Sequence, residues 1–113
     1  MFKQILSLML VSYSVFASNV GFLKYGVISD FTEDDIQQLQ LEYIQVLKNR
    51  KPGDVHSWQN TSTKNGGEIT VIKQYKQDDK SCKRLKFKNV SKHQSAVSYF
   101  NFCLIDQRWK VVS

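Results

Sequence analysis

The spacing of apolar residues changes once along the chain, close to Pro52. Before this residue, apolar side chains recur every three or four positions from Ile36 to Leu47, which is the period of one helix face. From Asp54 onward, apolar and polar residues alternate, which is typical of a strand with one buried face. The pattern therefore predicts one helix followed by a sheet.

Both ends of the predicted helix are marked in the sequence. Ser29 or Thr32 can cap its start, because a side-chain oxygen accepts hydrogen bonds from backbone N–H groups that lack a partner there. Asp35, three residues after Thr32, completes a variant of the capping box with Asp in place of the usual Glu. Acidic residues in the first turn and basic residues at the end suit the helix dipole, and Pro52 and Gly53 end the helix.

Runs of alternating residues predict five strands, at residues 54–60, 68–76, 81–90, 95–105 and 108–112. The first connection contains Asn65 and Gly66, a pair suited to positive φ angles. All the connections are short, which favours an antiparallel meander. We therefore predict an α+β domain in which one N-terminal helix packs on a five-stranded antiparallel meander sheet.

The two cysteines, Cys82 and Cys103, lie on the third and fourth predicted strands. If these strands form a symmetric hairpin around residues 89–94, the cysteines lie opposite each other and a cross-strand disulfide forms without distortion. A zinc site would need a closer set of ligands than these cysteines with His56 and His93, and a thioredoxin-type redox pair would need a C-x-x-C motif. We predict a structural disulfide that stabilises the domain by about 3 kcal/mol.

The same hairpin register separates the side chains of the third and fourth strands into two faces. Leu85 lies opposite Phe100 on an apolar face that must meet the helix. The other face combines a basic stripe with an aromatic residue, and this candidate binding face consists of Arg84, Lys86, Lys88 and Tyr99. Such a face suits an anionic polymer or lipid, and the chain carries a formal net charge of +6. Alternatively, the lysines only solvate an open sheet face and discourage edge pairing.

The first residues are typical of a secretory signal peptide, because Lys3 precedes an apolar run and Ala17 ends the small-residue pattern that signal peptidase requires. We predict a signal peptide at residues 1–17, a lead segment at 18–28 and the α+β domain at 29–113. The apolar run is shorter than the about 20 residues that span a bilayer, so we expect no transmembrane helix in the mature chain. Export would place the protein in the periplasm, at the outer membrane or at the cell surface. Expected partners there are lipopolysaccharide, phospholipid, peptidoglycan or an envelope protein rather than nucleic acid.

Motifs of common enzyme classes are absent from the sequence, including G-x-S-x-G, Gly-rich phosphate loops and H-E-x-x-H. We predict that His56 and His93 are each partly buried or on the surface, without a catalytic role. Trp58 and Trp109 are predicted to pack in the core. We therefore expect a protein that is not an enzyme, with no catalytic residue, no cofactor and no metal.

Several segments in order and spacing resemble the bacterial surface antigens related to the rickettsial seventeen-kilodalton outer-membrane antigen. They are GFLKYGVISDFTEDD, PGDVHSWQN with Trp58 and Asn60 as its W-x-N, GGEITV, Cys82 with Arg84, Cys103 and DQRWKVV. The chain departs from that family at Lys83, which follows the cysteine directly, and at Gln107 and Arg108, which replace the usual glycine. The glycine-rich segment and the lipid-bearing cysteine of the lipoprotein members are missing as well. The resemblance implies a non-enzymatic envelope protein that serves as a structural or interaction module, and it supplies no catalytic residues.

Overall fold

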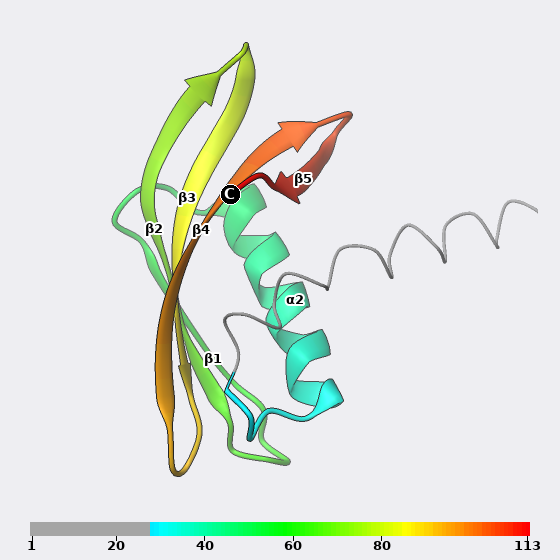
Figure 1. The fold of residues 1–113 in the computed structure, drawn as a ribbon, viewed down its shortest axis with the longest axis vertical. Helices are drawn as coiled ribbons and strands as arrows, with labels where there is room; N and C mark the ends of the chain where they lie inside the picture. Colours follow the sequence, from blue (N-terminus) through cyan, green and yellow to red (C-terminus); the bar gives the residue numbers. More distant parts are fainter. Residues whose placement is uncertain (1–27) are drawn as a thin grey trace, which may run out of the picture.

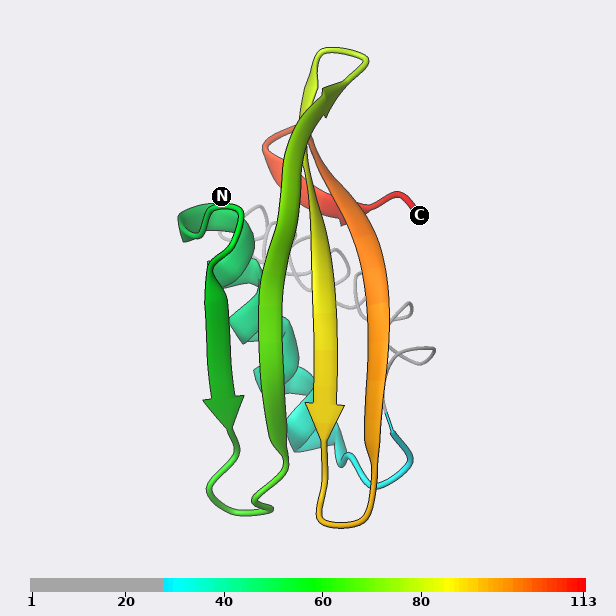
Figure 2. The ribbon, with the colours of Figure 1, turned by 90° about the vertical axis from the view of Figure 1, so that its left-hand side faces the viewer.

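The structure is a computed structural model that describes residues 28–113. Its elements are the helix α2 (Glu33–Asn49) and the strands β1 (Val55–Gln59), β2 (Gly66–Gln77), β3 (Lys80–Val90), β4 (Ser95–Ile105) and β5 (Arg108–Val111). Each strand pairs antiparallel with the next, in the order β1-β2-β3-β4-β5. The curled sheet carries α2 on one face (Figure 1), and a view of the opposite face shows the strands in front of the helix (Figure 2). We call this opposite face the open face; the predicted combination of one helix with a five-stranded antiparallel meander is observed.

The helix differs from the prediction in its place in the chain. It begins at Glu33, so it precedes the sheet but is not N-terminal in the chain, and that part of the expectation is not supported. The predicted signal peptide and residues 18–27 lie outside the described residues. Thr32 is the N-cap: its Oγ1 accepts the Asp35 N–H at 3.2 Å, and Asp35 Oδ2 accepts the Thr32 N–H at 2.8 Å. The predicted capping box is confirmed.

The connection between β1 and β2 departs from its predicted geometry. Its positive φ angle falls on Lys64, at 65°, and not on Asn65 or Gly66. Asn65 is buried, and its side-chain amide donates to Asp35. Gly66 already belongs to β2, where it lies between Gln59 of β1 and Val90 of β3. The prediction of positive φ angles at this pair is wrong, because a contact with the distant helix decides the conformation of the turn.

The register between β3 and β4 follows the prediction. Cys82 lies opposite Cys103 and the two are joined by a disulfide bond, while Leu85 lies opposite Phe100. The register between β2 and β3, in contrast, shifts by one residue at Ile72. Such a bulge inserts one unpaired residue and reverses which side chains of the strand point to each face.

The core lies between α2 and the sheet. Its most buried side chains are Leu39, Tyr43, Val46 and Leu47 from the helix and Trp58, Ile69, Val71, Leu85, Phe87 and Phe102 from the strands. The Tyr43 ring lies 5.4 Å from the Phe102 ring, centroid to centroid, and burial raises the pKa of Tyr43 to about 12. Trp58 is part of this core and Trp109 packs against it, as predicted for both tryptophans.

Candidate functional site

The four residues of the predicted candidate binding face lie together on the open face. In the β3–β4 register, Lys86 lies opposite Tyr99, Arg84 opposite Asn101 and Lys88 opposite Val97. Side chains of directly opposite residues share a face and lie within about 5.5 Å of each other at Cβ. The structure therefore brings Arg84, Lys86, Lys88 and Tyr99 into one surface, and their role in binding stays a prediction.

Two cation–aromatic pairs lie side by side on this surface. The Arg84 guanidinium carbon lies 5.0 Å from the centroid of the Tyr99 ring, and Lys73 Nζ lies 4.9 Å from that of Tyr75. Lys73 is the cross-strand partner of Arg84. A cation held over an aromatic face at this distance is attracted by the ring quadrupole.

No pattern in the sequence predicts that Lys73 and Tyr75 lie on the open face. Strict alternation from Glu68 and Thr70 would place Ile72 and Gln74 on the open face, but the bulge at Ile72 moves Lys73 and Tyr75 there instead. The sequence carries no Gly or Pro at this point that would mark a bulge. The only available signal was the low apolar content of residues 73–77.

Charge is distributed unevenly between the sheet and the helix. Glu68 is the only acidic residue in the five described strands, whereas β2, β3 and β5 carry many lysines and arginines. The acidic residues of the helix, Glu33, Asp34, Asp35 and Glu42, belong to the layer on the other side of the sheet. The open face is therefore strongly positive, which favours anionic partners.

Lys83 lies within this basic sequence but not on the open face. It is 7% exposed, and its Nζ donates to the carbonyl oxygens of Leu47 at 2.8 Å and Arg50 at 2.6 Å, at the C-terminal end of α2. It also lies 5.7 Å from the ring centroid of Trp109. Burial lowers the pKa of Lys83. The lysine satisfies carbonyl groups that a helix end leaves without partners, so its role is structural.

The opposite end of the helix is held by a buried carboxylate. Asp35 is 0% exposed and accepts hydrogen bonds from Thr63 Oγ1 at 2.6 Å, Asn60 Nδ2 at 2.7 Å, Asn65 Nδ2 at 2.8 Å and the Thr32 N–H. We call these five residues the Asp35 cluster. Burial alone would raise the pKa of Asp35, but the hydrogen bonds from Thr63, Asn65, Thr32 and Asn60 together lower it to about 2. A carboxylate that stays ionised and is fully hydrogen-bonded suits a structural role better than proton transfer.

The two histidines occupy ordinary positions. His56 is partly buried between Glu42 Oε1 at 2.6 Å and an Arg50 nitrogen at 3.2 Å, so it ties β1 to α2. His93 is exposed in the turn between β3 and β4. Both environments match the predicted partly buried and surface histidines.

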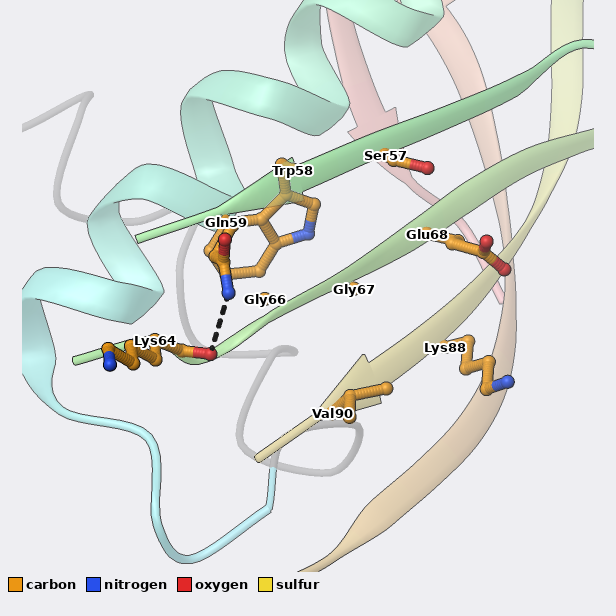
Figure 3. A pocket seen from close by; sticks show the side chains of 9 residues that line it. All are labelled: Ser57, Trp58, Gln59, Lys64, Gly66, Gly67, Glu68, Lys88 and Val90. Atoms are coloured by element: carbon orange, nitrogen blue, oxygen red, sulfur yellow. Dashed lines mark hydrogen bonds between the residues drawn. The ribbon is translucent and has the colours of Figure 1, made fainter. Parts of the chain in front are cut away.

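A hollow of about 370 Å³ opens at the end of the sheet where β1, β2 and β3 meet (Figure 3). Ser57, Glu68, Lys88 and Val90 line it around the glycines of β2, and Lys64 and Gln59 close one side. The Gln59 side-chain amide donates to the Lys64 carbonyl oxygen at 3.3 Å, which holds that side in place. No pattern in the sequence predicts this hollow.

The disulfide occupies both cysteines and no free cysteine remains. In residues 28–113, no helix is both long and apolar enough to cross a membrane.

Comparisons of the chain with protein-family models, with curated proteins and with solved structures found no match.

Proposed function

We propose that this protein is a non-enzymatic interaction module of the cell envelope that binds an anionic envelope component on the open face of its sheet. The observation that carries the proposal is the pair of adjacent cation–aromatic contacts, Arg84 with Tyr99 and Lys73 with Tyr75, beside Lys86. A single acidic residue, Glu68, shares this face.

The arrangement suits a partner whose charges are spread over a surface or along a polymer. Basic side chains at neighbouring positions of adjacent strands present several positive charges at once, and each one near an anionic membrane contributes about 1 kcal/mol. Lipopolysaccharide, anionic phospholipid and peptidoglycan are the partners that we propose. The signal-peptide pattern and the resemblance to surface antigens support the envelope location.

The competing interpretation is that the lysines only keep the sheet surface solvated. Solvation requires charge but no aromatic side chains, and Tyr99 is 45% exposed beneath the Arg84 guanidinium. An exposed ring on the same surface adds a contact area for sugar or headgroup carbons. The two cation–aromatic contacts therefore favour binding.

Binding to vesicles that contain phosphatidylglycerol tests the proposal. Changing Arg84, Lys86 and Lys88 together to Gln should weaken vesicle binding roughly 100-fold, since each basic side chain contributes about 1 kcal/mol. Rising salt should weaken wild-type binding steeply, because the Debye length is only about 8 Å at physiological ionic strength. Co-sedimentation at several salt concentrations measures both effects.

A matched control removes the same charge from other surfaces. Lys48 and Lys51 are exposed at the helix end, and Lys76 is exposed on β2 beside Tyr75 but points to the other face. Changing these three lysines to Gln should reduce binding only a few-fold. Equal losses in the two triple variants would refute the proposed binding face and favour the solvation interpretation.

The envelope location has its own test. Mass spectrometry of the protein isolated from its native cell should give a chain that starts at or near Ser18. A chain that retains Met1 would contradict the export on which this part of the proposal depends.

A further inference from the structure

The hollow on the open face exists because Gly66, the first residue of β2, has no side chain. Gly66 pairs with Gln59 of β1 and Val90 of β3, so a residue without a side chain lies between two residues that have one. A Cβ atom at Gly66 would lie 2.3 Å from the Trp58 carbonyl oxygen, and one at Gly67 would lie 2.1 Å from the Lys88 carbonyl oxygen. These contacts with backbone atoms leave no room for any other residue type, so the hollow is built into the sheet.

The hollow also holds two opposite charges that do not neutralise each other. Glu68 and Lys88 are direct cross-strand partners, yet they form no ion pair. In the described part of the chain, neither side chain makes a hydrogen bond, and the Ser57 hydroxyl makes none either. A carboxylate, an ammonium group and a hydroxyl thus line the same open hollow (Figure 3). All three side chains are exposed to solvent, so a ligand can reach them directly.

These groups restrict the chemistry of a ligand. Lys88 and the neighbouring basic residues attract an anion, whereas a cation would be repelled by the same surroundings. Glu68 accepts hydrogen bonds only, so the part of the ligand that contacts it must carry hydroxyl or similar donors. Val90 and the glycine Cα atoms offer apolar contact to C–H groups. The hollow is open to solvent, and its volume of about 370 Å³ is enough for one ring to lie against it.

We propose that this hollow binds an anionic sugar unit, with the acid group of the sugar on Lys88 and its ring hydroxyls on Glu68 and Ser57. The inference rests on the proposed function and makes it more specific, because it names the unit of the anionic partner that is recognised. Arg84 and Lys86 then attract the rest of the anionic partner, and the hollow distinguishes anionic sugars from other anions.

The probe is glucuronic acid, a pyranose with one carboxylate, and the readout is the backbone amide shift of Gly66 and Gly67 in an NMR titration of the protein. Both amides should shift with a millimolar dissociation constant. The informative variant is Glu68→Gln, which keeps the side-chain shape but removes the acceptor charge. It should weaken glucuronic acid binding about tenfold, as expected for losing a hydrogen bond to a charged group. It should strengthen binding of inorganic phosphate, because it removes a repulsive charge.

Weaker binding of glucuronic acid together with stronger binding of phosphate would show that the hollow recognises the sugar hydroxyls and does not only attract negative charge. If Glu68→Gln strengthens glucuronic acid binding as it does phosphate binding, the hollow does not recognise hydroxyls and the inference is overturned. Lys88→Gln should weaken glucuronic acid binding more than Lys86→Gln, which removes the same charge outside the hollow; equal effects would also overturn it. The vesicle assay reports the proposed function separately, since Glu68→Gln should preserve or strengthen binding to sugar-free anionic vesicles. A polymer of glucuronic acid units should bind at least as tightly as the monomer, and binding of the free sugar alone would contradict recognition of a unit within the anionic partner.

Discussion

Lys83 and Arg84 are adjacent in β3, and they show how different the two faces of the sheet are. Lys83 points toward α2, is buried, and donates to two carbonyl groups at the helix end. Arg84 points to the open face, lies over the Tyr99 ring and remains partly exposed to solvent. A positive side chain therefore stabilises the helix end on one face of the sheet, and on the other face it remains available to a partner.

The largest loss of stability is expected at the Asp35 cluster. Asp35→Ala removes the carboxylate that accepts from the Asn60, Thr63 and Asn65 side chains. The two amides keep one acceptor each, Asp34 Oδ2 for Asn60 and the Asp30 carbonyl oxygen for Asn65, but each loses one of its two hydrogen bonds. Each buried unsatisfied group costs about 1–3 kcal/mol, so a loss of about 3–5 kcal/mol is expected. Chemical denaturation measures it. A loss below about 1 kcal/mol would show that water replaces the carboxylate.

The disulfide should contribute almost as much. Replacing both Cys82 and Cys103 with Ser should lower the free energy of unfolding by about 2–5 kcal/mol, as for native disulfides of small secreted domains. The bond joins the central strand β3 to β4 beside Arg84 and Tyr99. A reduced wild-type protein should match the double variant, and a difference between them would point to a packing effect of the serines.

Acid should weaken the Asp35 cluster in a defined pH range. The pKa of Asp35 is about 2 in the folded protein and 3.8 in the unfolded reference, so the folded state holds the carboxylate ionised. Its contribution to stability is therefore complete above about pH 5 and is lost as the pH falls toward 2, for a total of about 2 kcal/mol. Denaturation at several pH values should show this slope in the wild type. In Asp35→Asn the total loss of stability between about pH 5 and pH 2 should be smaller by about 2 kcal/mol. Equal losses in the two proteins would contradict the lowered pKa of Asp35.

The smallest change in stability is expected at Arg84, on the open face, and it can be compared with the change at its neighbour Lys83. Lys83→Met removes the donor to the Leu47 and Arg50 carbonyl oxygens and should cost about 1–3 kcal/mol. Arg84→Met, one residue later, should change stability by no more than about 0.5 kcal/mol, as is usual at a surface position. Vesicle binding should show the reverse order, with the larger loss in Arg84→Met. If the two variants lose equal stability, the faces differ less than the contacts indicate.

Local periodicity was enough to predict most elements of the candidate binding face. Arg84, Lys86 and Lys88 share a face because side chains of a strand alternate, and Tyr99 joins them because the hairpin is symmetric about its turn. Lys73 and Tyr75 were missed because a bulge in β2 reverses the alternation, and no residue in the sequence marks it. The same alternation places Lys83 on the face of Leu85, toward the helix, but its two carbonyl partners at the end of α2 were not predicted, because they lie more than 30 residues away in the chain.

The helix with its capping box, the antiparallel order of five strands and the pairing of Cys82 with Cys103 could be predicted from the sequence. All of these follow from chain geometry over a few residues or one hairpin. The partners of Asp35, the carbonyl contacts of Lys83 and the hollow at Gly66 depend instead on how the elements pack together. Asp35 is bound by residues about 30 positions away in the chain, and Lys83 reaches helix carbonyls at a similar separation. The hollow is formed by three strands at once. Such arrangements depend on how separate elements pack, which no local pattern of residues records.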